Sequence, residues 1–197
     1  MNILVTNDDG ITGEGLRLLA EALRGLSGHT VFVLAPEDDR SGVSHSFSLN
    51  GPLRLRDWGN NTCSGTAAAA RQAAIYGIPG VAFSLVTLGE GPVFWESAAA
   101  FSRDHLEELV ALWEKDTFIN VNIPNSLDYP GELRMTVPSR CYYRDAVAGF
   151  DAPDGSRYCF IHRGPVVTDE DPGSDWGAIS RNQVAISVVH INPMVRS

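Results

Sequence analysis

Apolar runs alternate with amphipathic stretches along the first two-thirds of the chain. The first apolar run, residues 2–6, is followed by a segment in which Leu16, Leu19 and Leu23 recur at helical spacing, and a second apolar run follows at residues 30–35. A strand, a helix and a strand within 35 residues predict two parallel strands joined by a right-handed crossover. The same patterns predict further helices over residues 66–76 and 97–115 and further strands over residues 81–85 and 118–123.

The pattern changes from about residue 127. Residues 133–147 and 157–163 alternate between polar and apolar side chains. The turn sequence Pro153-Asp154-Gly155 lies between them, which predicts an antiparallel β-arm. We expect a short helix over residues 175–181 and a final strand over residues 184–190 to follow the arm.

These elements predict the α/β fold class, as a Rossmann-like three-layer parallel sheet with a C-terminal antiparallel β-arm. We divide the chain into three parts. Residues 1–126 form the Rossmann-like core, residues 127–170 form the β-hairpin arm, and residues 171–197 return to the core.

The composition is that of an ordinary globular protein, with 44% apolar and 20% charged residues. No apolar run approaches the roughly 20 residues that cross a bilayer, so we expect no membrane association. The N-terminus opens directly into the first strand, so we expect no signal peptide. Three scattered cysteines, Cys63, Cys141 and Cys159, form no disulfide or zinc pattern, which predicts reduced thiols in a cytoplasmic protein.

The charge balance disfavours a nucleic-acid polymer as a partner. The net charge is −9, and Lys115 is the single lysine among 15 basic residues. Proteins that grip DNA along its backbone carry a basic stripe, and this sequence shows none. A small anionic ligand would therefore need a bound metal ion or helix N-termini for its positive charge.

Two adjacent acids, Asp8 and Asp9, follow the first predicted strand. Ligands of open parallel sheets bind outside the carboxyl ends of the strands. Two ionised carboxylates repel each other in a partly buried crevice, and a divalent cation, which prefers oxygen ligands, would compensate. Gly10 lets the backbone turn sharply behind them. The pair therefore predicts a metal site, with an ordinary turn or helix cap as the alternative.

Two polar segments are expected near the acidic pair. The loop after the second strand contains Arg40 and Ser41, which could hold a phosphate or a metal, although a solvated loop is the alternative. The segment Ser64-Gly65-Thr66 precedes the alanine-rich helix, and its free backbone N–H groups suit a phosphate, with a plain N-cap as the alternative. The sequence has no G-x-S-x-G elbow and no P-loop, which excludes those two hydrolase classes.

Several blocks of sequence then occur in an order typical of one known family. They are residues 2–11, 35–36, 40–46, 67–74, 77–85, 120–124 and 143–145. Because the blocks run through nearly the whole chain, they are more specific than any single motif. On these blocks the chain resembles the SurE 5′/3′-nucleotidases.

The resemblance implies a site and an activity. In that family a divalent metal ion is held by the acidic pair, by the serine of an Arg-Ser-Gly loop and by an asparagine. Carried over, the first three ligands are Asp8, Asp9 and Ser41, and we expect one ion, Mg²⁺ or Mn²⁺. The family cleaves nucleoside phosphomonoesters, and its members form homodimers or homotetramers in which the C-terminal β-arm is exchanged.

One departure from the family pattern affects this site. The family has two Ser-Gly-Thr sites separated by a strand and a helix, whereas this chain has one, at residues 64–66. The residues before it match the first site and those after it match the second, so a helix, a central strand and the metal-binding asparagine are missing. A central parallel strand cannot be lost without breaking the ladder on both sides. Either the chain has lost this segment, or the complete protein contains it and has an intact mass above 21.3 kDa.

We therefore predict a metal-dependent phosphomonoesterase that hydrolyses nucleoside 5′- and 3′-monophosphates. Asp8 and Asp9 are the expected catalytic residues, and Ser64, Gly65 and Thr66 the expected phosphate-binding residues. A nucleotide-binding SurE-like protein with impaired catalysis is one alternative, because the asparagine ligand is missing. A receiver-type signalling domain is a second, although the lysine it needs late in the sheet is replaced here by Lys115 at a helix end.

Overall fold

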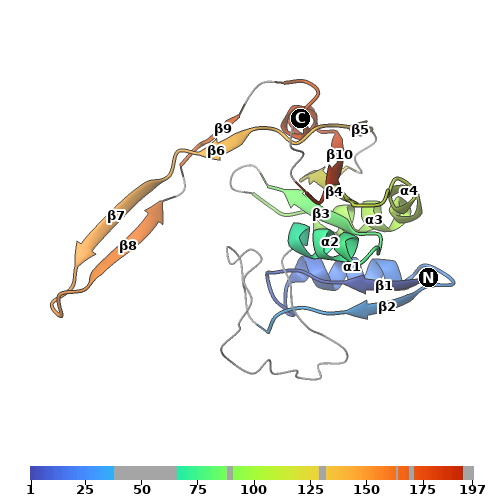
Figure 1. Ribbon diagram of the computed structural model, residues 1–197, viewed down its shortest axis with the longest axis horizontal. Coiled ribbons are helices and arrows are strands. Elements are labelled where there is room, and N and C mark those ends of the chain that lie inside the picture. The colour runs from blue at the N-terminus through green and yellow to red at the C-terminus, as the bar shows by residue number, and fades with distance from the viewer. Residues whose placement is uncertain (38–65, 88–90, 129–131, 163, 169–170, 193–197) are drawn as a thin grey trace.

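The predicted strand–helix–strand unit forms the N-terminal part of the molecule. In the computed structural model, β1 (Asn2–Val5) and β2 (Thr30–Val33) pair in parallel, and α1 (Glu14–Arg24) crosses between them (Figure 1). The structure describes residues 1–37, 66–87, 91–128, 132–162, 164–168 and 171–192. Within these ranges, no helix is both apolar enough and long enough to span a bilayer.

A second, four-stranded sheet contains most of the core. Its order is β3 (Val81–Val86), β4 (Thr117–Pro124), β10 (Val184–His190) and β5 (Leu133–Met135). β3 runs parallel to β4, β10 runs antiparallel to β4, and β5 runs parallel to β10. The sheet is therefore mixed, and the α/β class is confirmed.

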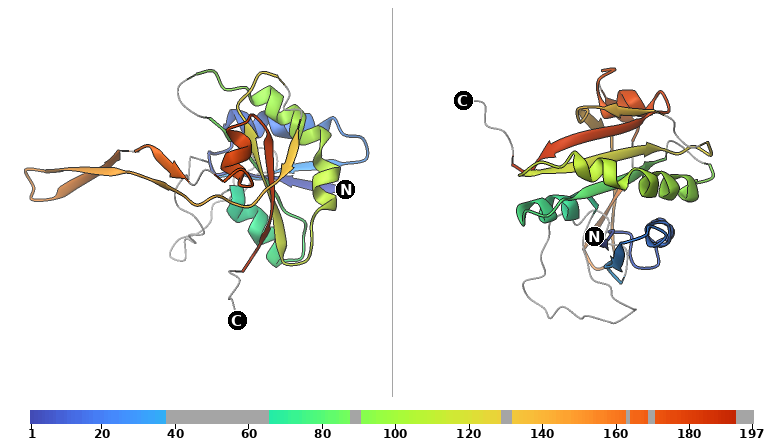
Figure 2. Two further views of the ribbon diagram at one scale, coloured as in Figure 1. Left: turned by 90° about the horizontal axis from the view of Figure 1, so that it is seen from above. Right: turned by 90° about the vertical axis from the view of Figure 1, so that its right-hand side faces the viewer.

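Helices cover both faces of this sheet, as Figure 2 shows. Alternate residues of β4 point to opposite faces. Ile119, Val121 and Ile123 pack on one face with Phe101 of α3 (Trp95–Asp104). On the other face Phe118 packs with α2 (Thr66–Ile75), and Ala185 of β10 packs with α5 (Asp175–Ile179). This is the predicted three-layer arrangement.

The single helix expected over residues 97–115 is two helices. α3 ends at Asp104 and α4 (Leu106–Ala111) begins after His105, whose φ and ψ of −106° and 3° are not helical. The break has a packing reason. On either side of it, Phe101 and Leu109 pack against the four-stranded sheet, and Leu106 packs in the cluster around α1.

The sheet is not continuous from β2 to β5. Among the described residues, β1 pairs with β2 alone and β3 pairs with β4 alone, so the strands form two separate groups in the core. The continuous parallel sheet expected from the sequence is therefore interrupted. The interruption coincides with the point between β2 and α2 at which the family pattern has a further helix and strand.

The antiparallel arm extends away from the core (Figure 1). β7 (Ala146–Asp151) pairs with β8 (Arg157–His162) as a hairpin, and β6 (Cys141–Tyr143) pairs with β9 (Val166–Thr168) at its base. The sequence placed residues 133–135 in the arm, and this was wrong. They form β5, because β10 offers them an edge in the core.

The tip of the arm is a turn closed by side-chain hydrogen bonds. The backbone N–H and the hydroxyl of Ser156 both donate to Asp154 Oδ1, at 2.9 and 2.5 Å. These hydrogen bonds, the hydroxyl's first, lower the pKa of the Asp154 carboxyl below its ordinary value. Gly155 has a φ of +83°, which glycine adopts without strain.

Candidate active site

The acidic pair lies where the sequence placed it, just beyond the carboxyl end of β1. Asp8 is partly buried and Asp9 is exposed. Gly10 has a φ of +103°, and it turns the chain toward α1. The backbone N–H of Ile11 donates to the carbonyl of Pro36 at 2.7 Å, which ties this turn to the end of β2. The turn therefore holds two carboxylates at the strand edge where ligands of α/β proteins bind.

The side chain of Asn7 stabilises this turn through a hydrogen bond, and the sequence did not predict this role. Its side chain is 8% exposed, and its Nδ2 donates to the carbonyl of Gly10 at 3.2 Å. A Cβ on Gly13 would lie 2.9 Å from that Nδ2, so glycine is needed for this close approach. No sequence signal beyond the position of Asn7, directly before the acidic pair, could have shown this role.

Two buried oxygens beside the acidic pair have no hydrogen-bond partner within the described part of the chain. They are Oγ1 of Thr6 and Oδ1 of Asn7. Leaving a buried acceptor unpaired costs about 1–3 kcal/mol, so such atoms call for a donor. Both residues line a pocket of about 100 Å³ together with Asp9.

The pocket separates the two groups of strands. One wall comes from Leu16 and Leu19 of α1, and the opposite wall comes from Phe83 of β3 and from Trp95 and Ser102 of α3. A Cβ on Gly15 would lie 2.7 Å from the Trp95 ring, so α1 and α3 meet closely at one end of the pocket. The walls are therefore apolar, and the polar groups gather at the carboxyl end of β1.

The remaining predicted site residues are not brought to the acidic pair by the described structure. Ser41, Ser64 and Gly65 lie outside the described residues. Thr66 is the first residue of α2, and its side chain is not described. The metal-ligand and phosphate-binding assignments for these four residues stay predictions.

The described donors fit a hard divalent cation in chemistry and fall short of a full ligand set. Carboxylates and amide oxygens are the groups that Mg²⁺ and Mn²⁺ prefer, and Asp8, Asp9 and Asn7 carry them within three consecutive residues. No group of three or more His, Cys, Asp and Glu side chains that could hold a metal ion occurs among the described residues. A metal here would need further ligands from outside these ranges.

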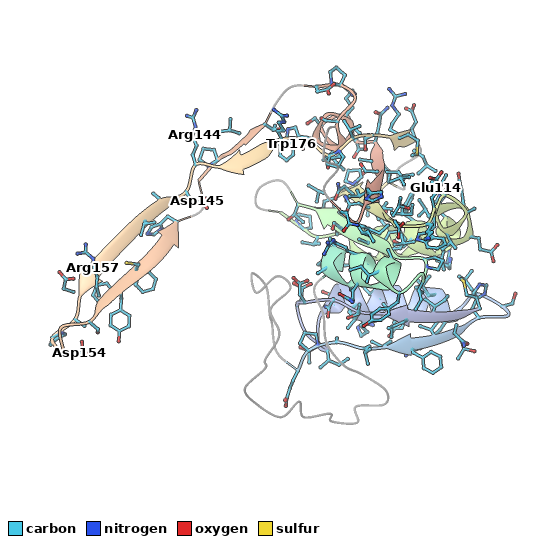
Figure 3. The ribbon with its side chains drawn as sticks, in the orientation of Figure 1. Glu114, Arg144, Asp145, Asp154, Arg157 and Trp176 are labelled. Carbon is cyan, nitrogen blue, oxygen red and sulfur yellow. The ribbon has the colours of Figure 1, made fainter. Side chains whose placement is uncertain are left out.

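The block at residues 143–145 lies on the arm and away from the acidic pair. Figure 3 shows Arg144 and Asp145 at the junction between the two strand pairs of the arm. Asp145 Oδ1 accepts from the backbone N–H of Gly164 at 3.0 Å, and the N–H of Arg144 donates to the carbonyl of Pro165 at 3.1 Å. A Cβ on Gly164 would clash with the Arg144 carbonyl. These hydrogen bonds therefore hold the two sides of the arm together at the junction between its strand pairs.

The fold and the site together define a class of protein. It is an α/β protein with an acidic turn just beyond the carboxyl end of its first strand. The sequence matches the family model described as "Survival protein SurE" over residues 3–62 and 57–145. The chain belongs to the SurE family.

Relatives and a solved structure agree with this assignment. The chain is 33% identical to the 5′-nucleotidase SurE of Geobacter sulfurreducens, with 98% of this chain and 88% of that protein covered. It is 34% identical to the 5′-nucleotidase SurE of Pelobacter propionicus, with 98% and 94% covered. The crystal structure of the SurE protein from Aquifex aeolicus has the same fold, with a TM-score of 0.79 at 24% identity over 98% of this chain and 95% of that one.

The relatives contain residues that this chain lacks. The alignment with the Geobacter sulfurreducens protein runs over 236 positions, and 98% of 197 residues is about 193, so about 43 positions hold no residue of this chain. The two matches to the family model overlap at residues 57–62, which places the break between β2 and α2.

Proposed function

We propose that this protein is a 5′-nucleotidase that hydrolyses the phosphomonoester of nucleoside 5′-monophosphates, with activity on 3′-monophosphates as well. The observation that carries the proposal is the acidic turn at the carboxyl edge of β1, in a chain of the SurE family. The names of the relatives, 5′-nucleotidase SurE, support the substrate class.

In this proposal one divalent ion, Mg²⁺ or Mn²⁺, is held by Asp8 and Asp9, with Ser41 as a further ligand. Such an ion neutralises phosphoryl charge and makes a nearby water more acidic. Asp8 and Asp9 orient this end of the site, because Asn7 and the Ile11–Pro36 hydrogen bond fix their backbone. The helix N-terminus at residues 64–66 would bind the phosphoryl oxygens. Water would then form a bond to the phosphorus in line as the bond to the nucleoside oxygen breaks, and the proton lost by the water would end on that oxygen.

Asp8→Asn tests the proposal. We expect the phosphate released from nucleoside 5′-monophosphates in the presence of Mg²⁺ or Mn²⁺ to fall at least about 100-fold, because one anionic ligand becomes neutral. The melting temperature should stay close to that of the parent, because Asp8 is not part of the core. Glu21→Gln is the matched control, since Glu21 is an exposed carboxylate on α1 that pairs with Arg17. Unchanged turnover in Asp8→Asn, or in excess chelator, contradicts the assignment.

A nucleotide-binding protein without catalysis is the second candidate. The observation that favours it is the short ligand set: the turn offers two carboxylates, and no group of three or more His, Cys, Asp and Glu side chains that could hold a metal ion occurs among the described residues. Binding of a nucleoside monophosphate by calorimetry, with no phosphate release under any divalent metal, would select this candidate. The receiver-type alternative is wrong, because the chain belongs to the SurE family.

We further propose that the antiparallel arm, which runs from β6 to β9, joins copies of this chain into a homodimer or homotetramer. Four large apolar side chains of the hairpin are at least half exposed: Val147, Phe150, Tyr158 and Phe160. The ring of Phe150 stacks on Tyr158 and Phe160, at centroid distances of 5.4 and 5.8 Å, so these three rings form one apolar surface, and Val147 lies on the other face of the hairpin. An exposed surface of this kind is typical of an interface. We place the protein in the cytoplasm, where Cys159, an exposed free thiol, would stay reduced.

Phe150→Ser tests the role of the arm. We expect the oligomer measured by light scattering to dissociate at least in part, because the substitution removes the ring at the centre of the apolar surface. Arg157→Ser on the neighbouring strand, whose side chain makes a long ion pair with Asp151, is the control and should leave the oligomer intact. A parent protein that is monomeric at all concentrations contradicts the proposal.

A further inference from the structure

The strand edges of β1 and β3 that face the pocket are unpaired in the described part of the chain. β1 pairs only with β2 on its other side, and β3 pairs only with β4. Thr6 and Asn7 follow the end of β1, and Leu85 lies near the end of β3, and all three line the same pocket. The carboxyl ends of β1 and β3 therefore lie at the same pocket. Each edge presents backbone N–H and C=O groups that can accept another strand.

The residues that line the pocket offer apolar contacts for the side chains of a strand and acceptors for its backbone. The side chains of the pocket walls are mostly apolar, including Leu16, Phe83 and Trp95. Thr6 Oγ1 and Asn7 Oδ1 lie just beyond the carboxyl end of β1. They have no hydrogen-bond partner among the described residues, and Asn7 is 8% exposed, so both oxygens need donors. The N–H groups of an inserted backbone are donors of the required kind.

The face of β1 and β2 opposite α1 is also uncovered. Leu4 and Phe32 are direct neighbours in the strand register, and they point away from the side where Val5 and Val33 meet α1. They are 59% and 41% exposed. On the four-stranded sheet the corresponding face carries α2 and α5. Within the described ranges, no helix packs on Leu4 and Phe32 on this face of the β1–β2 pair.

The relatives contain a segment of the right length at the right point of the chain. About 43 alignment positions have no residue here, and the break falls between β2 and α2. A strand of 5–6 residues, a helix of 11–12 and their short connections fit within that length. The missing positions in sequence and the uncovered surfaces in space therefore describe the same strand–helix unit.

We propose that the space between β1 and β3 is an acceptor site for a strand–helix segment of a separate polypeptide. The strand pairs with the free edges of β1 and β3 and donates to Thr6 and Asn7, and the helix packs its apolar face on Leu4 and Phe32. Main-chain pairing gives such a site its affinity, and the apolar contacts give it its selectivity. The site acts through folding, so it does not depend on the proposed catalytic activity.

The probe is a synthetic peptide. It contains the residues of the Geobacter sulfurreducens relative that are aligned with no residue of this chain. We expect it to bind the 197-residue chain one to one, and a peptide with the same residues in scrambled order to bind at least about 10-fold more weakly. Amide exchange of β1 and β3 should slow at least about 10-fold on binding, and that of β7 and β8 should not change. Leu4→Asp should weaken binding at least about 10-fold, whereas Val147→Asp, at another exposed apolar position on the arm, should not.

Three outcomes overturn the proposal. Equal binding of the designed and scrambled peptides, or no binding by either, means that the edges do not accept a specific strand. A dimer of this chain that protects β1 and β3 from exchange means that a second copy fills the site. A mass of the native protein well above 21.3 kDa means that the segment belongs to the same chain. None of these readouts measures phosphatase activity, so the proposed function stands or fails separately.

Discussion

The two groups of strands in the core differ in how completely they are buried. In the four-stranded sheet, Ile119, Val121 and Val184 are fully buried, and helices lie on both faces. In the β1–β2 pair one face is covered by α1, and the other leaves Leu4 and Phe32 exposed. The acidic turn belongs to this less complete pair. The more completely buried core therefore lies in the four-stranded sheet, and the candidate catalytic residues Asp8 and Asp9 follow a strand of the less completely buried pair.

The largest effect that tests this contrast is on stability. Phe101→Ala should lower the free energy of unfolding by about 3–5 kcal/mol, because Phe101 is fully buried against the four-stranded sheet. Phe32→Ala, the same substitution on the uncovered face, should lower it by less than about 1 kcal/mol. Urea denaturation of both variants measures the two values. Equal losses would show that the face bearing Phe32 is covered in solution.

A smaller change in stability, with a larger change in activity, is expected at Asn7. Asn7→Ala removes the hydrogen bond to Gly10 but also removes an unpaired buried oxygen, so the free energy of unfolding should change by about 1 kcal/mol or less. Phosphate release should fall at least about 10-fold, because the acidic turn loses its anchor. Asn122→Ala is the control, since its amide bonds Asp175 on the opposite face of the other sheet. Full activity in Asn7→Ala would show that the hydrogen bond between Asn7 and Gly10 is not needed for catalysis.

The smallest effect is expected in the arm, which belongs to neither group. Hydrogen bonds from Ser156 lower the pKa of the Asp154 carboxyl, so they stabilise the fold above the carboxyl's ordinary pKa, and this contribution is lost as pH falls through the lowered value. Ser156→Ala should raise the pKa of Asp154 toward its ordinary value in an NMR titration. The stability difference between the variant and the parent should be present at neutral pH and vanish in acid. An unchanged Asp154 titration would contradict this account of the turn.

Local patterns in the sequence predicted most of the secondary structure. The strand over residues 184–190 has the expected bounds, and α2 and β3 are within a residue or two of theirs. Periodicity could not show the break at His105, because Phe101 before it and Leu109 after it keep an apolar face toward the same cluster. It could not place residues 133–135 either, since a short alternating run fits an arm and a sheet edge equally well.

The candidate site divides in the same way. The position of Asp8 and Asp9 at the end of a strand followed from the apolar run before them, and the structure has them there. The roles of Ser41 and Ser64 stay predictions, because these residues lie outside the described ranges. The anchoring of the turn by Asn7 and the pocket beside it depend on contacts with Gly10, Gly13 and the distant β3, which no local pattern specifies.

The sequence by itself determined the α/β class, the acidic turn, the arm and the absence of one strand–helix unit, because each is a property of neighbouring residues or of motif order. Only the tertiary structure decided where that absence matters. Among the described residues, it places β1 and β3 in separate sheets, leaves Leu4 and Phe32 exposed, and gives two buried oxygens no hydrogen-bond donor. The physical reason is that a strand is completed by its neighbours in space, and these are fixed only when the whole chain is folded.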